Sequence, residues 1–325
     1  MSAEVRLNCS TMFSLGMGGA DAASEHLLLD AILTLPNVRH VTLTTPERGY
    51  YQHSIALGIS PILPTLRSLH IHYVRPSGGR EEIISHLSKA IANAPHLSSL
   101  TVTLQPSYRA ELSSATSLHT LFGALARGQR PPLKLTALNL SGFSIRLDDE
   151  TLPHLRHLRS LTLAHFQDPS SLRTEAYEAV AKFAAPFPDL WRGFMSVGVQ
   201  LTHINVRHMS DGLAEYVNSY CGLEDIKIYV PSYYRHGRII YQPANIFWDA
   251  MAGKHGETLR SLDLISQYEG CWCFNAATLA KCRNLVVLRI GIGTSRFNYP
   301  PFQKRASDFL NQSCHEVVRV TLTRV

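Results

Sequence analysis

The chain has 325 residues, of which 45% are hydrophobic and 17% are charged, and its formal net charge at pH 7 is +6. Basicity this mild is not by itself the footprint of a nucleic-acid-binding protein. No run of about 18 apolar residues is present, so the sequence predicts no membrane-spanning helix. The six Cys are scattered, and residues 1–19 lack the basic start and apolar core of a signal peptide. We therefore expect an intracellular protein, cytoplasmic or nuclear, with reduced Cys.

One short phrase recurs along the chain: an apolar residue, two residues of any kind, a second apolar residue, one residue of any kind, and a third apolar residue. About five copies are expected by chance. The chain contains ten, which do not overlap: Val38/Val41/Leu43, Leu66/Leu69/Ile71, Leu97/Leu100/Val102, Leu135/Leu138/Leu140, Leu158/Leu161/Leu163, Leu201/Ile204/Val206, Leu223/Ile226/Ile228, Leu259/Leu262/Leu264, Leu285/Leu288/Ile290 and Val317/Val320/Leu322. This is the phrase of leucine-rich repeats, and such a repeat decides the architecture of the whole chain.

The phrase predicts an α/β fold. We expect a right-handed leucine-rich-repeat solenoid, or horseshoe, of about ten irregular repeats, with a parallel sheet on the concave side and helices on the convex side. Successive copies begin 22 to 43 residues apart, often more than the roughly 20–29 residues of regular repeats, which leaves room for a helix. We expect one domain over residues 1–325, with a cap or loop at 1–23 and an insertion at 186–198.

The elements follow from apolar periodicity and from helix-stopping residues. For the first half we expect a short strand at residues 5–7, a loop at 10–20, a helix ending at Leu35, a strand at 39–44, and helices at 80–93, 115–127 and 149–155. For the second half we expect helices at 174–185, 211–220, 244–253, 275–282 and 303–312, the second of them capped by Asp211. The Asn that usually closes the phrase is missing from every copy, so each corner after a strand is expected to differ.

The sequence pattern of the repeats resembles that of a known family. The segments Leu-Pro-Thr-Leu-Arg-Ser-Leu-His-Ile at 63–71 and Leu-Arg-His-Leu-Arg-Ser-Leu-Thr-Leu at 155–163 are similar to the repeat half of fungal F-box proteins. In that family the repeats present a substrate to a ubiquitin ligase, while an N-terminal F-box grips the adaptor. The F-box opening, Leu-Pro-x-Glu followed by apolar helices, does not stand before the first repeat. The resemblance therefore implies the substrate-binding half, with a ligase adaptor as partner only if an F-box is supplied elsewhere.

The residues that flank the second and third apolar positions of each phrase point away from the core, so they form the concave face of the predicted sheet. In the first five copies they are mostly small and neutral. In the later copies charges of both signs concentrate there, at His203, Asn205, Arg207, Asp225, Lys227, Tyr229, Asp263, Arg289 and Arg319. A sheet face that is simply solvated has the same composition, and we keep this alternative open.

The loops that leave the seventh, eighth and ninth predicted strands are rich in Tyr, Trp and Arg, which are the residue types of binding hot spots. Such loops share one rim of a solenoid, so we predict a partner site formed by this rim and the C-terminal concave face. Its predicted residues are His203, Asn205, Arg207, Asp225, Lys227, Tyr229, Tyr233, Tyr234, Arg235, Arg238, Tyr268, Arg289, Arg296, Phe297 and Tyr299. The alternative is that these aromatic side chains fold over the rim and close the irregular corners.

No catalytic, metal or cofactor site is predicted. Cys271, Cys273 and Cys282 lack a paired two-Cys knuckle, and no nucleophile elbow or phosphate-binding loop is legible. Three further groups invite a ligand and are better explained as an entry loop, a helix start and solvated side chains: Gly16–Gly19, Asp148–Glu150, and the His pairs His70/His72 and His154/His157.

We therefore expect a non-enzymatic protein–protein interaction module that binds another protein, in the manner of the substrate-recognition part of an F-box-type ubiquitin ligase. The alternative is a nucleic-acid binder. In that case Arg207, Lys227, Arg289 and Arg319 would neutralise phosphates, and the basic aromatic loops would stack on RNA bases. Heparin retention and a steep salt dependence of RNA binding would favour the alternative.

Overall fold

The computed structural model describes residues 12–16, 38–45, 60–73, 80–104, 116–128, 130–141, 143–144, 147–164, 187–206, 209–230, 241–266, 276–292 and 319–324. Contacts within the chain divide it into two compact units, and the single domain expected over residues 1–325 stays a prediction. Unit 1 comprises residues 1–158 and 164–183, and unit 2 comprises residues 159–163 and 184–325. Each unit is an α/β arrangement with a parallel sheet that does not close into a barrel. In the described ranges, no helix has the length and apolar character needed to cross a membrane.

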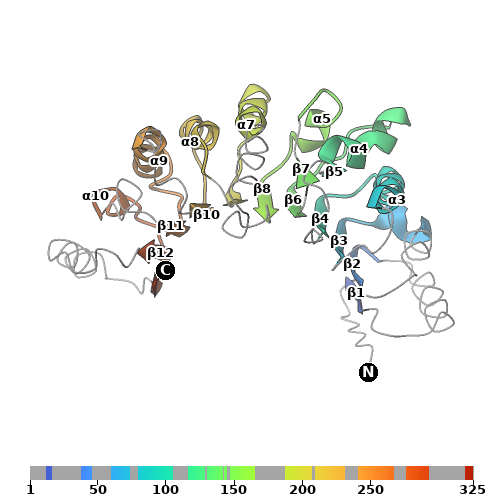
Figure 1. Cartoon of the computed structure of the whole chain (residues 1–325), viewed down its shortest axis with the longest axis horizontal. Helices are drawn as coiled ribbons and strands as arrows, with labels where there is room; N and C mark the ends of the chain where they lie inside the picture. Colours follow the sequence, from blue (N-terminus) through green and yellow to red (C-terminus); the bar gives the residue numbers. More distant parts are fainter. Residues whose placement is uncertain are drawn as a thin grey trace, which may run out of the picture. The chain divides into compact units, whose positions relative to one another are not determined.

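Unit 1 is built on five parallel strands that neighbour one another in sequence order: β1 (Met12–Gly16), β2 (His40–Thr45), β3 (Ser68–Tyr73), β4 (Ser99–Leu104) and β6 (Ala137–Ser141). Two short strands, β5 (Thr116–Ser117) and β7 (Phe143–Ser144), form a separate parallel pair. The helices of this unit are η1 (Ser60–Thr65), α3 (Arg80–Ala92), α4 (Leu118–Arg127) and α5 (Leu152–Leu155). Helices α3 and α4 pack against each other (Figure 1).

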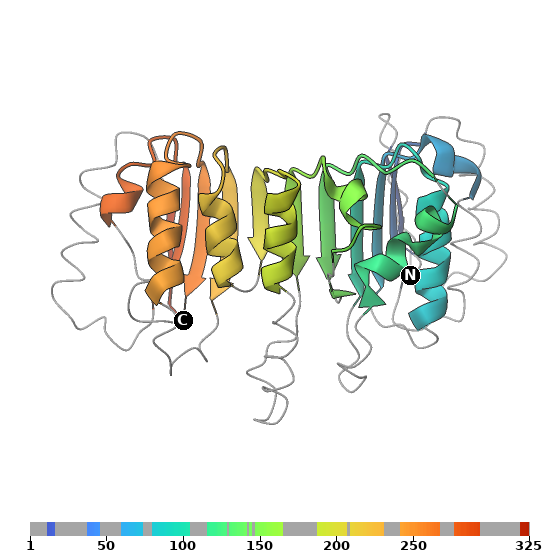
Figure 2. The ribbon, with the colours of Figure 1, turned by 90° about the horizontal axis from the view of Figure 1, so that it is seen from above.

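Unit 2 repeats this plan with six strands. They are β8 (Ser160–Ala164), β9 (His203–Val206), β10 (Asp225–Val230), β11 (Ser261–Ser266), β12 (Val287–Ile292) and β13 (Arg319–Arg324), all parallel and adjacent in sequence order. The connecting helices are α7 (Phe187–Ser196), α8 (Asp211–Asn218), α9 (Tyr241–Gly253) and α10 (Ala276–Leu279). Figure 2 shows α7, α8 and α9 side by side over one face of the strands, and neighbouring helices contact one another. The other face of this sheet carries no described helix.

The apolar positions of the phrase explain the core. All ten phrases end in a strand, and the strands pair so that equivalent apolar residues lie in line. In unit 2, for example, Ile204 pairs with Ile226 and Ile226 with Leu262, and each is at most 2% exposed. Because side chains alternate across a strand, a slip of one residue would turn this whole row to solvent. Burial of the row therefore fixes the register of neighbouring strands.

A repeated backbone contact aligns the starts of the strands. The carbonyl oxygen of Thr202 accepts hydrogen bonds from the N–H groups of Glu224 and Asp225, at 2.9 and 3.0 Å. The carbonyl of Glu224 accepts in the same way from the first residues of the next coil. The same pattern occurs in unit 1, where the carbonyl of Arg67 accepts from Ser98 and Ser99. The same pair of backbone hydrogen bonds thus joins one coil to the next in both units.

Several predicted elements are confirmed and others differ, among them the helices expected at 149–155 and 275–282, which are shorter and span Leu152–Leu155 and Ala276–Leu279. The strand expected at 39–44 is β2, and the helices expected at 80–93 and 244–253 are α3 and α9. The expected loop at 10–20 is wrong, because residues 12–16 form β1, whose backbone finds partners along β2. The helix expected from residue 115 begins at Leu118, because residues 116 and 117 pair with β7 instead.

Two further differences lie in unit 2. The expected insertion at 186–198 contains helix α7, which buries Trp191 and Phe194 to 1% and 0% exposure. Asp211 is not the cap of its helix, because the side chain of Ser210 accepts the hydrogen bond from the N–H of Leu213. The elements expected at residues 5–7, 21–35, 174–185 and 303–312 lie outside the described residues. Of the residues standing where the closing Asn is missing, Phe143 and Met209 are described, and both are buried.

Candidate functional site

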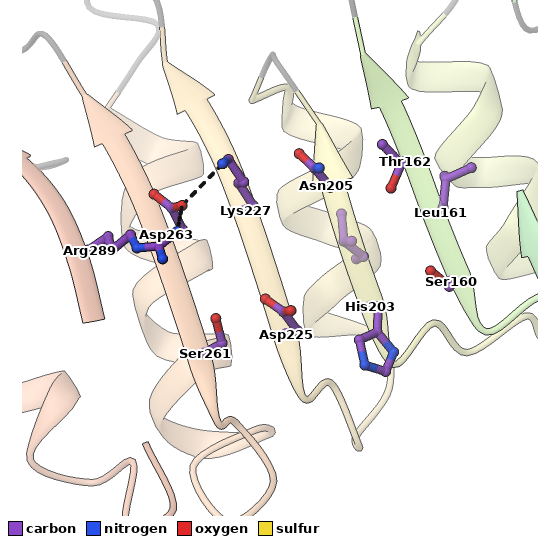
Figure 3. Close-up of a pocket in the computed structure, with 11 residues that line it drawn as sticks. Ser160, Leu161, Thr162, His203, Asn205, Asp225, Lys227, Ser261, Asp263 and Arg289 are labelled. Carbon is purple, nitrogen blue, oxygen red and sulfur yellow. Dashed lines mark hydrogen bonds and ion pairs between the residues drawn. The ribbon is translucent and has the colours of Figure 1, made fainter. Parts of the chain in front are cut away.

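A partly enclosed hollow of about 270 Å³ lies on the sheet face of unit 2 that the helices leave open. It spans strands β8 to β12, and the helices stand behind the sheet in Figure 3. The residues that line it are Ser160, Leu161, Thr162, His203, Ile204, Asn205, Asp225, Lys227, Ser261, Asp263 and Arg289. Most of them are polar or charged, which sets this face apart from the aliphatic face packed under the helices.

Strand register arranges the polar side chains in two rows. The first row consists of five residues at paired positions on neighbouring strands: Thr162, Asn205, Lys227, Asp263 and Arg289. The second row lies two residues earlier on each strand and comprises Ser160, His203, Asp225 and Ser261. Neighbouring strands are about 4.8 Å apart, and two residues advance roughly 6.6 Å along a strand. The rows therefore cross the strands as two parallel lines of polar groups (Figure 3).

The last three residues of the first row form an ion-pair triad, Lys227–Asp263–Arg289. Only 6% of the Asp263 side chain is exposed, and its Oδ2 lies 3.3 Å from Nζ of Lys227 and 3.4 Å from Nη1 of Arg289. Both cations thus converge on one oxygen of a buried carboxylate (Figure 3). The other oxygen, Oδ1, is buried without a hydrogen-bond partner among the described residues.

The two cations of the triad remain open to solvent. The side chains of Lys227 and Arg289 are 45% and 47% exposed. An ammonium carries three donors and a guanidinium five, and within the described structure each side chain gives one contact to Asp263. The remaining donors are therefore available to a ligand. Counting two cations and one carboxylate, the triad has a formal charge of +1.

The second row presents a mixture of acceptors and donors. The hydroxyl of Thr202 donates to the carbonyl of Arg159 at 3.2 Å, and its oxygen lies 2.8 Å from Nδ1 of His203. Because a hydroxyl has one proton, Nδ1 of His203 is the donor in the second contact. Nε2 of the exposed imidazole is then the ring atom left for a ligand. The carboxylate of Asp225 follows on the next strand.

The second row contains the residue types of an acyl-transfer triad without the geometry of one. Ser160, His203 and Asp225 occupy paired positions on three adjacent strands. In such a triad the carboxylate accepts from Nδ1 of the imidazole and so orients the ring. Here Nδ1 faces the hydroxyl of Thr202, and no hydrogen bond or ion pair joins these three side chains. The three side chains are separate polar groups on the open face of the sheet.

Five residues of the predicted partner site meet in this hollow: His203, Asn205, Asp225, Lys227 and Arg289. Tyr229 lies in β10, opposite Ile265, and its side chain is outside the described part. The remaining predicted residues also lie outside the described residues: Arg207, Tyr233, Tyr234, Arg235, Arg238, Tyr268, Arg296, Phe297 and Tyr299. The aromatic rim therefore stays a prediction.

Sequence reasoning did not select four polar residues that line the hollow, namely Ser160, Thr162, Ser261 and Asp263. The most informative of them is Asp263, which we had placed on the concave face but not in the site. A signal was present, since Asp263 occupies the same phrase position as Lys227 and Arg289 in the copies before and after it. Aligning the copies by phrase position brings one acid between two cations.

Two of the residues that invited a metal, His154 and Cys282, are buried in the core. Nδ1 of His154 accepts from the N–H of Leu133 at 2.9 Å, so this ring satisfies a buried backbone donor. Burial raises the pKa of the Cys282 thiol to about 11, which disfavours the thiolate that binds metals. Over the described ranges, no group of three or more His, Cys, Asp or Glu side chains is placed to hold a metal ion. Cys271 and Cys273 lie outside these ranges.

Comparison with known proteins adds no relative: neither a protein-family model nor a curated protein sequence significantly matches this chain.

Proposed function

We propose that this chain is a leucine-rich-repeat protein, a right-handed solenoid of about ten irregular repeats, that acts inside the cell as a non-enzymatic protein-binding module. The parallel strands at all ten phrases and the backbone contact passed from coil to coil support the repeat architecture. In this proposal the strands line the concave side and the helices the convex side. The free thiols of Cys221 and Cys282 support a reducing compartment, such as cytoplasm or nucleus.

One observation carries the proposal: the hollow of unit 2, with its two polar rows and a buried carboxylate bound on one oxygen only. A buried ion pair contributes little to folding, because desolvation of the charges offsets their attraction. Because both of its cations keep exposed donors, the triad is better explained by binding than by stability. Exposed side chains that project in two rows offer hydrogen bonds at fixed spacing, which suits a protein segment.

Charge favours a protein over a nucleic acid as the ligand. Two of the four ionised side chains in the hollow are the acids Asp225 and Asp263. Nucleic-acid surfaces neutralise a regular array of phosphates with cations, and acids within the footprint oppose this. By resemblance to the repeat half of fungal F-box proteins, we propose substrate recognition for a ubiquitin ligase as the biological setting. Cullin and adaptor subunits among the proteins recovered with the chain would support this setting.

The test is a change that fills the hollow without altering its charge. Asn205→Trp places a large side chain in the first row, beside Lys227. Asn218→Trp is its matched control, since Asn218 is exposed at the end of α8 and does not line the hollow. Partners recovered by affinity purification and mass spectrometry should be lost with Asn205→Trp and retained with Asn218→Trp, at equal thermal midpoints.

Two outcomes would contradict the proposal. If both variants recover the same partners as the unchanged protein, the hollow is not the binding site. If the chain instead binds RNA, with affinity falling steeply as salt rises and with retention on heparin, the nucleic-acid alternative holds.

A further inference from the structure

We infer that the Lys227–Asp263–Arg289 triad receives a single carboxylate from an acidic side chain of a partner protein, and that Asp263 is the positioning residue of this subsite. The inference rests on the proposed function, because it names the chemistry of the segment that the hollow binds.

The geometry brings two donors to one place. Lys227 and Arg289 lie on β10 and β12, on either side of Asp263 on β11, at paired positions of the three strands. Left alone, two neighbouring cations with long flexible side chains would diverge. Oδ2 of Asp263, 3.3 and 3.4 Å from their nitrogen atoms, holds both of them over the same strand (Figure 3). Their remaining donors then lie side by side at the surface, because both side chains are nearly half exposed.

The net charge of the triad determines how much negative charge a bound anion should carry. Its formal charge of +1 is balanced by one carboxylate. A phosphate group carries about −1.5 to −2 near neutral pH and would leave excess negative charge on the triad. Without Asp263 the two cations would carry +2, so Asp263 both positions the cations and lowers the anionic charge that the subsite accepts.

The second row limits what lies beside the acidic side chain. Asp225 stands two residues before Lys227 on β10, roughly 6.6 Å along the strand. A second acid at this distance would be repelled, whereas a hydrogen-bond donor or a basic side chain would be accepted. Nε2 of His203 and the hydroxyl of Ser261 flank Asp225 on the two neighbouring strands. The fitting segment therefore carries one Asp or Glu with neutral polar or basic neighbours.

The probe is a displayed library of random twelve-residue peptides, selected on the immobilised full chain and then on the Asn205→Trp variant. Peptides lost on that variant are those that need the hollow. We expect them to share one acidic residue in a common frame. For the best of them, replacing its Glu by Gln should weaken binding about tenfold, the size expected for a close charge pair.

Two variants of the chain link this acid to the triad. Arg289→Gln should weaken the Glu peptide about tenfold and leave the Gln peptide nearly unchanged, because the two changes remove the same contact. Asp263→Asn should reverse the preference, so that a phosphoserine peptide of the same sequence binds more tightly than the Glu peptide. A role for Asp263 in folding alone would not exchange one anion for another. Arg283→Gln is the control, since Arg283 forms an exposed ion pair with Glu257 away from the hollow.

The outcomes separate this inference from the proposed function. Peptides that need the hollow but lack an acid, or that tolerate Arg289→Gln, would overturn the inference and leave the protein-binding function standing. Phosphoserine peptides preferred by the unchanged chain would also overturn it. If Asn205→Trp weakens the binding of no peptide and of no cellular partner, both the inference and the proposed function are wrong. If Asp263→Asn strongly lowers the thermal midpoint, its binding data cannot be used. The inference is then tested by Arg289→Gln alone, because this change removes an exposed group and should leave the fold intact.

Discussion

Nδ1 of His255 accepts a hydrogen bond from the backbone N–H of Leu223, with 3.2 Å between the two nitrogen atoms. Nε2 lies 2.8 Å from the carbonyl oxygen of Val217, so the ring carries its proton on Nε2 and donates it there. The ring is fully buried, just after α9, and it ties α8 to the first residue of the seventh phrase. The bond from Leu223 requires the neutral imidazole, since a protonated ring has no acceptor nitrogen, whereas Nε2 donates to the Val217 carbonyl in either state.

The first prediction is a loss of stability in mild acid. Burial lowers the pKa of His255 below its ordinary value of 6.5, and the charge of Lys254 adds to this effect. The unfolded chain therefore binds a proton at a higher pH than the folded chain. The stabilisation is complete above pH 6.5 and is lost as the pH falls below that value toward the folded-state pKa. Thermal melts followed by circular dichroism should show a lower midpoint at pH 5 than at pH 7.

The variant His255→Leu measures how much of the pH dependence of stability comes from this ring and how much from other acid-sensitive groups. The change leaves the N–H of Leu223 and the carbonyl of Val217 buried without partners, so it should cost about 2–3 kcal/mol at pH 7. Its midpoint should also vary less with pH than that of the unchanged protein. Some dependence should remain, because burial lowers the pKa of His154 as well. Parallel pH profiles for the two proteins would show that His255 does not sense acid.

The second prediction concerns the close approach of the chain at Gly256. A Cβ atom there would lie 2.8 Å from the carbonyl oxygens of both Ala252 and Lys281, and neither backbone group can move freely. Gly256→Ala should destabilise the protein by about 1–3 kcal/mol. At Gly253, the last residue of α9, nothing lies within 4 Å of an added Cβ. Gly253→Ala should be neutral or slightly stabilising in denaturant titrations, and equal effects at the two sites would contradict the packing described here.

The third prediction tests helix α7, in the segment expected as an insertion. Phe194 is fully buried against the rings of Trp191 and Tyr216, with centroids 6.1 Å away in both cases. Phe194→Ala should cost about 3–5 kcal/mol in the free energy of unfolding. Arg192→Ala is the control, because Arg192 is exposed on the same helix and its loss should change stability by less than about 0.5 kcal/mol. A small effect of Phe194→Ala would mean that this segment is dispensable to the core.

The fourth prediction distinguishes the two residues at the start of α8. Ser210 accepts the hydrogen bond from the N–H of Leu213, whereas Asp211 is the first helical residue and only favours the helix dipole. Ser210→Ala should cost about 1 kcal/mol. Asp211→Asn keeps the side-chain shape and should cost at most a few tenths of a kcal/mol in moderate salt. The reverse order in chemical denaturation would restore Asp211 as the cap.

The phrase positions show why much of the fold was predictable. Ile204, Ile226 and Leu262 each mark the buried side of a strand, and the two-residue alternation that places them is local. The helices at 80–92 and 241–253 follow in the same way from apolar side chains at helical spacing. Strand β1 was missed because residues 12–16 carry no phrase. Their pairing depends on the backbone of β2, which lies far along the chain.

The candidate site was also predictable only in part, for the same reason. His203, Asn205, Asp225, Lys227 and Arg289 were placed on one face by sequence alone, since the phrase fixes which side of each strand a residue occupies. The partners within that face could not be read from sequence, because they depend on which strands neighbour one another and in what register. Asp263 shows the difference: its neighbours Lys227 and Arg289 are 36 and 26 residues away along the chain.

By itself, then, the sequence determined the alternation of strands and helices and the polar face of each strand, because hydrophobic periodicity is a property of neighbouring residues. Only the tertiary structure decided that two cations from separate coils converge on one buried carboxylate, that His255 serves two backbone groups, and that α7 joins the core. These are contacts between segments distant in the chain. They exist because stacking aliphatic rows brings one particular register of strands together.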